Sequence, residues 1–230
     1  MPHPRSWAKR PWPPRASVAE SAPSPCIYVL AGTNGAGKSS IAGAMFSRRG
    51  PGYFNPDEAA RRIREENPAF SQEEANSAAW NQGKRLLERA IDERLNFAFE
   101  TTLGGNTIVA LLEQALATGI EVRMWYAGLS SPDLHIARVR ARVARGGHDI
   151  PEDRIRERYH RSRLNLIRLL PQLTELLVYD NSYDADPAAG AVPRPMLVLH
   201  VQRGKLIESC EPAEAPEWTK PVLLAAFNLK

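Results

Sequence analysis

The chain has 230 residues, a formal net charge of +4, 43% hydrophobic residues and 24% charged residues. These values are ordinary for a globular protein, and the length suffices for one α/β domain with a full core. Apolar runs such as residues 26–31 are far below membrane-spanning length, and no signal peptide is expected. Cys26 and Cys210 are far apart and Cys26 opens a predicted buried strand, so we expect no disulfide and a cytoplasmic location.

The positive charge is concentrated at the start of the chain. Residues 1–25 carry four basic residues against one acidic residue, so the rest of the chain is nearly neutral. A broad basic face for nucleic acid is therefore not predicted. The same residues include seven prolines, and we expect a disordered tail at 1–25. Contact between this tail and nucleic acid is the less favoured alternative.

Strands and helices alternate from residue 26 to about residue 180. The predicted strands cover residues 26–31, 53–55, 97–99, 120–126 and 176–179. The predicted helices cover residues 39–48, 71–95, 106–118 and 131–145, and two more begin at Pro56 and Pro151. This alternation predicts an α/β fold with a parallel sheet covered by helices on both faces.

The C-terminal residues follow another pattern. Residues 196–201 and 205–208 flank Arg203-Gly204, which predicts a β-hairpin. We expect a catalytic domain at 26–181, with a lid at about 138–163, and a C-terminal extension at 182–230 with a hairpin and a helix.

The most specific single motif is a glycine-rich loop between the first predicted strand and the next helix. It reads Gly32-Thr33-Asn34-Gly35-Ala36-Gly37-Lys38-Ser39 and matches the phosphate-binding loop in every fixed position. The glycines let backbone N–H groups surround phosphate oxygens, and the following helix directs its positive end at them. Lys38 is expected to contact the β- and γ-phosphates, and the Ser39 hydroxyl to bind Mg²⁺. The loop by itself does not distinguish a kinase from an ATPase or GTPase.

Two acids follow predicted strands, at the end where open α/β sheets bind ligands. Asp57, in Asn55-Pro56-Asp57, is either the base that orients an acceptor hydroxyl or a surface acid favoured by the helix dipole. Glu100 closes a strand with buried phenylalanines and precedes Thr101-Thr102. It is predicted to bind substrate hydroxyls or a Mg²⁺-bound water, and a helix N-cap role is the alternative.

Residues 138–163 hold nine arginines and four acidic residues. Three arginines on each of two predicted helices recur at helical spacing, namely Arg138, Arg142 and Arg145, and then Arg154, Arg158 and Arg161. Joined by Gly146-Gly147-His148, these helices predict a hinged lid that supplies positive charge to transferring phosphates. For any single arginine a solvated salt bridge is the favoured alternative. His148 is either a lid contact or a helix C-cap, and it has no metal-ligating neighbour at suitable spacing.

Taken together, these motifs resemble the zeta toxin family from about residue 26 to residue 181. The resemblance is carried by Gly32–Ser39, Asn55-Pro56-Asp57, Phe99-Glu100-Thr101-Thr102-Leu103, Arg138-Val139, Arg142-Val143, Gly146-Gly147-His148-Asp149-Ile150-Pro151 and Arg158-Tyr159. It implies a fold like that of nucleotide and shikimate kinases, with ATP and Mg²⁺ as cofactors. It also implies phosphorylation of a nucleotide sugar, UDP-N-acetylglucosamine, at the 3′-hydroxyl of the amino sugar.

The resemblance also implies residue roles. Asp57 would deprotonate the sugar hydroxyl, Glu100 would hold the substrate, and Lys38 with Ser39 would hold ATP and Mg²⁺. Arg142 fits the first phosphate contact of the lid, and either Arg154 or Arg158 the second. The expected nucleotide-binding residues are Gly32, Thr33, Asn34, Gly35, Ala36, Gly37, Lys38, Ser39, Ser40, Arg138, Arg142 and Arg154. The expected acceptor-binding residues are Asn55, Asp57, Glu100, Thr101 and Thr102, and the expected catalytic residues are Asp57, Lys38, Arg142 and Arg158.

The sequence favours a small-molecule kinase over two alternatives. One is a kinase that acts on a nucleotide or a nucleic-acid end, which the nearly neutral body disfavours. The other is a regulatory ATPase that transfers no phosphate to an acceptor. Residues 182–230 match no part of the family pattern, and no antitoxin segment is recognisable in the chain, so a separate antitoxin protein is a candidate partner.

Overall fold

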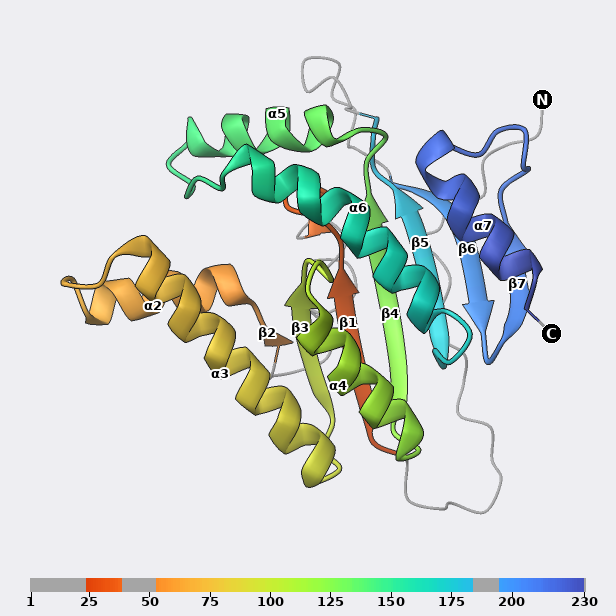
Figure 1. Ribbon diagram of the computed structural model, residues 1–230, viewed down its shortest axis with the longest axis horizontal. Helices are drawn as coiled ribbons and strands as arrows, with labels where there is room; N and C mark the ends of the chain where they lie inside the picture. The colour runs from red at the N-terminus through yellow and green to blue at the C-terminus, as the bar shows by residue number, and fades with distance from the viewer. Residues whose placement is uncertain (1–23, 39–52, 184–194, 230) are drawn as a thin grey trace.

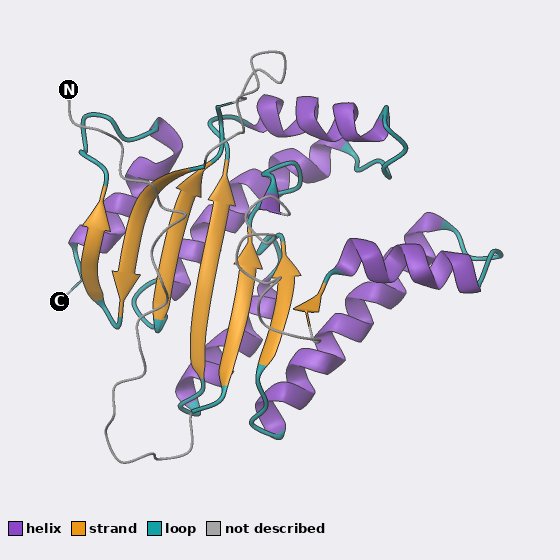
Figure 2. Cartoon of the chain, turned by 180° about the vertical axis from the view of Figure 1, so that it is seen from behind, coloured by secondary structure: helices purple, strands orange, loops and turns teal. Residues whose placement is uncertain are grey.

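The computed structural model describes residues 24–38, 53–183 and 195–229. Within these ranges, seven strands form one sheet in the order β2-β3-β1-β4-β5-β6-β7 (Figures 1 and 2). The strands are β1 (Cys26–Ala31), β2 (Tyr53–Phe54), β3 (Phe97–Thr101), β4 (Glu121–Gly128), β5 (Glu175–Asp180), β6 (Met196–Gln202) and β7 (Lys205–Ser209). Strands β1 to β5 pair in parallel, whereas β6 and β7 are antiparallel. The predicted mixed α/β fold with a mostly parallel sheet is confirmed.

The described residues also form six α-helices around this sheet. They are α2 (Pro56–Glu66), α3 (Gln72–Asp92), α4 (Asn106–Ala117), α5 (Pro132–Val143), α6 (Glu152–Leu169) and α7 (Lys220–Phe227). Helices α4, α6 and α7 lie on one face, and α5 lies beyond the carboxyl ends of the parallel strands (Figure 1). The helix predicted at 39–48 and the tail at 1–23 lie outside the described residues. No helix in the described part of the chain is long and apolar enough to cross a membrane.

The core fills the space between the sheet and its helices. Ile27 and Val29 of β1 are fully buried against residues such as Leu112 of α4 and Leu166 of α6. The alternate residue Leu30 faces the opposite side of the sheet, where it packs with Trp125. The largest cluster extends from α3 to α7, so the C-terminal residues complete the same core. Within the described residues, neither the buried Cys26 nor the half-buried Cys210 forms a disulfide.

The residues at the start of α2 and α3 explain where these two helices begin. The Asn55 side chain accepts hydrogen bonds from the backbone N–H groups of Asp57 and Glu58, and Pro56 occupies the first turn of α2. Ser71 and Glu74 form the predicted capping box at the start of α3. These caps orient both helices at the carboxyl ends of β2 and β3.

The C-terminal hairpin extends the main sheet. β6 pairs with β5, and β7 pairs with β6. Arg203 and Gly204 both have positive φ angles, +49° and +71°. This is the geometry of a type I′ turn, whose twist matches that of paired strands.

Candidate functional site

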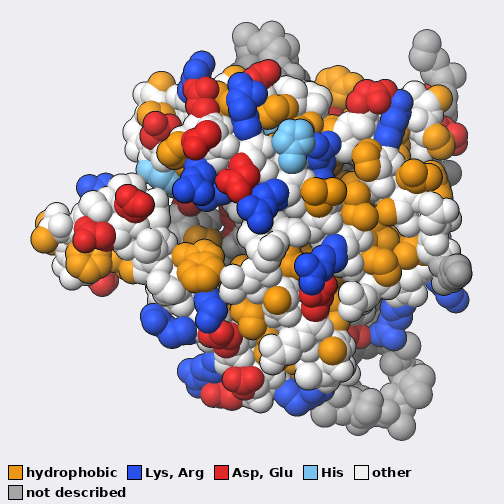
Figure 3. Space-filling view, viewed as in Figure 1, with side chains coloured by type: hydrophobic (Ala, Val, Ile, Leu, Met, Phe, Trp, Pro, Cys, Tyr) orange, Lys and Arg blue, Asp and Glu red, His pale blue; other side chains and the backbone are white. Residues whose placement is uncertain are grey.

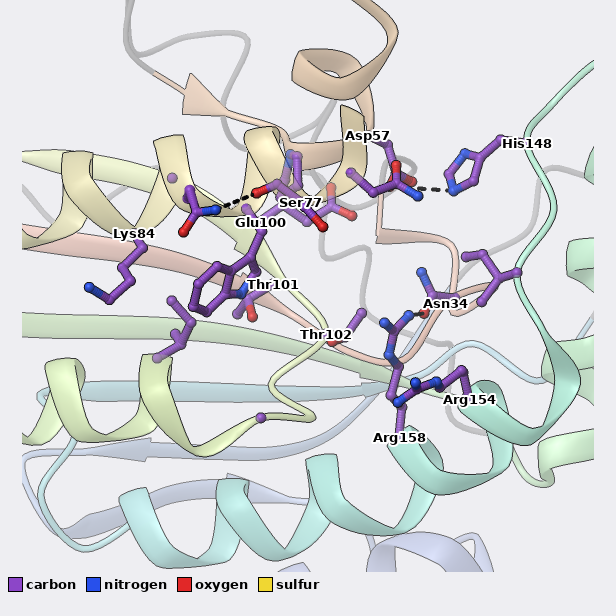
Figure 4. A pocket seen from close by; sticks show the side chains of 18 of the residues that line it. Asn34, Asp57, Ser77, Lys84, Glu100, Thr101, Thr102, His148, Arg154 and Arg158 are labelled. Carbon is purple, nitrogen blue, oxygen red and sulfur yellow. Dashed lines mark hydrogen bonds and ion pairs between the residues drawn. The ribbon is translucent and has the colours of Figure 1, made fainter. Parts of the chain in front are cut away.

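A cleft of about 740 Å³ opens at the carboxyl ends of the parallel strands, within the range of small-molecule sites. Its walls come from the phosphate loop, the end of β3, one face of α3 and the lid. Figure 3 shows the surface hollowed between the α2–α3 pair and the lid, with charged side chains around the opening. Figure 4 shows Ser77 and Lys84 of α3 on one side of this pocket and Arg154 and Arg158 on the other.

The phosphate loop, here Gly32–Lys38, has the backbone that its glycines predict. Gly32 has φ +138°, and a Cβ atom there would lie 2.1 Å from the Ala127 carbonyl oxygen. Gly37 has φ +79°, and a Cβ atom would lie 2.3 Å from the Asn181 side chain. Larger residues would therefore displace the loop from its support. Ser39 and Ser40 lie outside the described residues, so their predicted contacts with Mg²⁺ and nucleotide stay predictions.

Three side chains from distant parts of the chain support this loop. The Asn34 carbonyl oxygen is 2.8 Å from His135 Nδ1, and the Asn34 side-chain oxygen accepts from Arg158 at 2.7 Å. The Asn181 side chain donates to the Ala36 carbonyl at 2.9 Å. Burial lowers the pKa of His135 to about 4, against the opposing effect of its bond to Asn34. A neutral imidazole therefore supports the loop at neutral pH.

Glu100 lines the cleft, and both of its carboxylate oxygens are engaged by neighbouring side chains. One carboxylate oxygen accepts from the Tyr53 hydroxyl at 2.8 Å and from the Asn55 side chain at 3.3 Å. The other lies 3.4 Å from Lys38 Nζ, which also donates to the Gly32 carbonyl at 2.7 Å. Glu100 does not cap a helix, because α4 begins at Asn106 and its N-cap is Gly105.

Tyr53 is a site residue that sequence reasoning missed. Burial, and secondarily the negative charge of Glu100, raises the pKa of the Tyr53 phenol well above its ordinary value. The hydroxyl therefore stays protonated and donates to the carboxylate. No sequence signal identified it, because a tyrosine at the end of a strand is ordinary.

The loop after Glu100 is held in an uncommon conformation. Leu103 is buried with φ +54°, and its N–H donates to the Thr101 hydroxyl at 3.0 Å. Asn165 of α6 donates to the Leu103 carbonyl at 2.8 Å. These bonds fix Thr101 and Thr102 against the cleft, where both are among its lining residues.

Asp57 lines the cleft and meets the lid. One of its carboxylate oxygens is 3.5 Å from Arg142 Nη1, and the other is 3.9 Å from His148 Nε2. Arg142 also donates to the His148 carbonyl at 3.2 Å. Asp57 occupies the first turn of α2, where the helix dipole favours an acid, so both sequence interpretations are compatible with its position. His148 faces Asp57 and does not cap α5, whose C-cap is Ala144.

The lid arginines differ in what they contact. Several form exposed ion pairs, as the salt-bridge alternative predicts, namely Arg140 with Glu152, Arg156 with Asp133 and Arg161 with Glu157. Arg154 and Arg158 line the cleft, although Arg154 also forms an exposed ion pair with Glu157, and Arg142 reaches the cleft through Asp57. Arg138 is half-buried on α5 and outside the lining of the described cleft.

Arg154 and Arg158 make the end of the cleft beside the phosphate loop electropositive. Burial lowers the pKa of Arg158, and repulsion by Arg154 adds to this effect. Two neighbouring guanidinium groups would be stabilised by a bound anion. In the described ranges, no group of three or more His, Cys, Asp or Glu side chains is placed to hold a metal ion.

Comparison with known proteins agrees with this geometry. Residues 15–185, well over half of the chain, match the zeta toxin family. The chain belongs to the zeta toxin family. It is 33% identical over 129 residues to an uncharacterized protein of Haemophilus influenzae, a match that covers 56% of this chain and 88% of that protein.

Solved structures share the fold of this zeta toxin family member. A chain of the AvrRxo1-ORF1:-ORF2 complex superposes with a TM-score of 0.62 at 16% identity, covering 88% of this chain and 64% of that chain. A putative kinase from Chloroflexus aurantiacus superposes with a TM-score of 0.52 at 15% identity, covering 72% of this chain and 94% of the kinase. This chain thus spans less than two thirds of the AvrRxo1 chain, and such low identities show the fold alone. Family and fold together support a kinase-like, ATP-dependent function.

Proposed function

We propose that this protein transfers the γ-phosphate of ATP to a hydroxyl group of a small acceptor, a nucleotide sugar such as UDP-N-acetylglucosamine. The observation that carries the proposal is the convergence of Lys38, Asp57 and Glu100 on one cleft at the carboxyl ends of the strands. Zeta toxin membership supports the same reaction class. The AvrRxo1-ORF1:-ORF2 complex, which shares the fold, was also solved with ATP.

The loop residues fit the phosphates of a nucleotide. Lys38 donates its ammonium group to the Gly32 carbonyl at the start of the loop Gly32–Lys38. When ATP binds, we expect Lys38 to exchange part of these contacts for phosphate oxygens. Arg142, Arg154 and Arg158 are the candidates that balance the charge on the transferring group.

Asp57 is the proposed base of the transfer. It would accept the proton of the acceptor hydroxyl while the new oxygen–phosphorus bond forms and the bond to the β-phosphate oxygen breaks, which releases ADP. Glu100, oriented by Tyr53 and Asn55, would accept hydrogen bonds from a neighbouring acceptor hydroxyl. Mg²⁺, bound in part by Ser39, would neutralise charge on the phosphates.

The test is transfer to defined acceptors. The full chain is incubated with ATP, Mg²⁺ and a panel of nucleotide sugars, nucleotides and short oligonucleotides, and products are read by mass spectrometry. One acceptor should gain one phosphate. Asp57→Asn should slow transfer about 10²- to 10⁴-fold, the typical contribution of a general base, with ATP binding retained.

Asp153→Asn is the matched control, because Asp153 is also an acid in the first turn of a helix but lies outside the cleft lining. Its transfer rate should equal that of the wild type. ATP consumption with no acceptor modified, unchanged in Asp57→Asn, would favour the regulatory ATPase instead. Transfer to oligonucleotide ends would favour the nucleic-acid kinase. A separate antitoxin stays a further proposal, for which the solved AvrRxo1-ORF1:-ORF2 assembly is a two-component precedent in the same fold.

A further inference from the structure

The part of the cleft farthest along α3 carries a large aromatic side chain that the proposed chemistry does not use. Trp80 lines the cleft and remains 45% exposed. The residues one turn away on the same helix face line the cleft too, namely Asn76, Ser77, Gly83 and Lys84. The buried face of α3 is separate and consists of residues such as Ala75 and Leu87. Trp80 is therefore the centre of a cleft-facing strip and is not part of the core.

This strip is long compared with one sugar ring. Cleft-lining residues of α3 run from Gln72 to Lys84, which at 1.5 Å per residue is about 18 Å. Asp57 and Glu100 contact the cleft nearer to the phosphate loop. An acceptor that places a hydroxyl at Asp57 and fills the α3 strip is consequently an elongated molecule with a second recognisable group.

The surroundings of Trp80 indicate what that group is. Ile108 and Thr107, at the start of α4, line the same cleft, so an apolar side chain and a hydroxyl accompany the indole. Asn76 and Asn81 add amide donors and acceptors. Lys84, the cation among the cleft-lining residues of α3, is paired with Glu88 at 2.6 Å, so the strip offers little net charge. An aromatic face with polar amides and hydroxyls beside it suits a flat, uncharged ring with hydrogen-bonding edges.

We propose that Trp80 forms a stacking subsite for the nucleobase of the acceptor, so that the enzyme selects nucleoside-containing acceptors. The inference rests on the proposed function for the identity of the occupant, because it assigns the ring to the same molecule that receives the phosphate. Phe70 is the useful contrast. It is 39% exposed but lies outside the cleft lining, at the loop between α2 and α3.

Binding is measured on the full chain with Mg²⁺ and a non-hydrolysable ATP analogue present, so that the nucleotide site is filled and no transfer occurs. The calorimetric titrants are UDP-N-acetylglucosamine, the four common ribonucleosides and N-acetylglucosamine 1-phosphate. Trp80→Ala should weaken binding of the best nucleoside-containing titrant about ten- to a hundredfold. Trp80→Phe, which keeps an aromatic ring, should lose less affinity than Trp80→Ala. Phe70→Ala should bind as tightly as the wild type does. The base-free sugar phosphate should bind weakly and equally to all four proteins.

Fluorescence gives an independent readout. Nucleoside-containing titrants should quench the intrinsic tryptophan emission of the wild type, and that quenching should disappear in Trp80→Phe. Circular dichroism and thermal melting establish that each variant is folded.

Three results would overturn the subsite. The first is a folded Trp80→Ala variant that binds the nucleoside-containing titrants as tightly as the wild type does. The second is a loss of affinity for the sugar phosphate in Trp80→Ala as large as the loss for the whole nucleotide sugar, and the third is that no base-containing titrant shows Trp80-dependent binding. Failure of the proposed kinase function has a different signature. If the kinase function fails, Trp80-dependent binding persists but mass spectrometry finds no phosphorylated acceptor. If Trp80→Ala transfers phosphate at the wild-type rate, the kinase function is supported and the subsite is not.

Discussion

Acidification should destabilise the fold through His135, the buried imidazole behind the phosphate loop. The Asn34 carbonyl can only accept a hydrogen bond, so His135 Nδ1 carries the proton and Nε2 is unprotonated at neutral pH. Adding a second proton places a charge in a buried site. The neighbouring charges of Lys38, Arg138 and Arg163 oppose it further. The unfolded chain meets none of these costs.

The sign and the size follow from the two pKa values. The folded pKa of about 4 lies below the ordinary value of 6.5, so the unfolded state binds the proton first as the pH falls. Stability is complete above pH 6.5, declines as the pH falls toward 4, and then levels off. A pKa difference of one unit corresponds to about 1.4 kcal/mol of unfolding free energy. The unfolding free energy lost across the full pH range is therefore about 3 kcal/mol, and the part lost at pH 5 is about 2 kcal/mol.

Urea unfolding at a series of pH values between 7.5 and 5 measures this effect. Carboxylates also titrate at the acid end, so the quantity of interest is the difference between wild type and His135→Gln, whose amide keeps a donor for the loop. Between pH 7.5 and 5, the unfolding free energy of the wild type should fall by about 2 kcal/mol more than that of this variant. His160→Gln, at an exposed histidine of α6, should parallel the wild type.

A constant difference between wild type and His135→Gln, within about 0.5 kcal/mol across this range, would refute the reasoning. It would mean that the imidazole is not held neutral behind the loop. Titration of the imidazole signals by NMR supplies a direct check, since one histidine should stay neutral down to about pH 4.

Two further substitutions test how the site is held. Asn165→Ala removes the donor to the buried Leu103 carbonyl and should lower the unfolding free energy by about 2 kcal/mol; an unchanged urea midpoint would contradict this role. Tyr53→Phe removes the hydroxyl that donates to Glu100 and should lower the unfolding free energy by about 1 to 2 kcal/mol. It should also raise the acceptor KM several-fold with little change in ATP affinity, and equal effects on both substrates would argue against an acceptor-side role for Glu100.

The sequence alone determined the local features of this protein. The phosphate loop, the capping box of Ser71 and Glu74, the Pro56 helix start and the alternation of strands and helices all depend on residues a few positions apart. Short-range spacing is enough for such features, because caps, turns and amphipathic faces are formed by near neighbours. The strand ends that carry Asp57 and Glu100 were predicted for the same reason.

Only the tertiary structure decided which distant side chains meet. Arg158 and Asn34 are 124 residues apart, and Asn181 and Ala36 are 145 apart, yet each pair is hydrogen-bonded. Helical spacing by itself did not separate Arg154 and Arg158, which line the cleft, from Arg161, which forms a surface ion pair with Glu157, because all three recur at the same spacing. For Trp80 the sequence left core packing and cleft packing both open, since the exposed face of α3 becomes a wall only where α4 and the lid approach it. Contacts of this kind depend on how the sheet orders its strands, which no local pattern specifies.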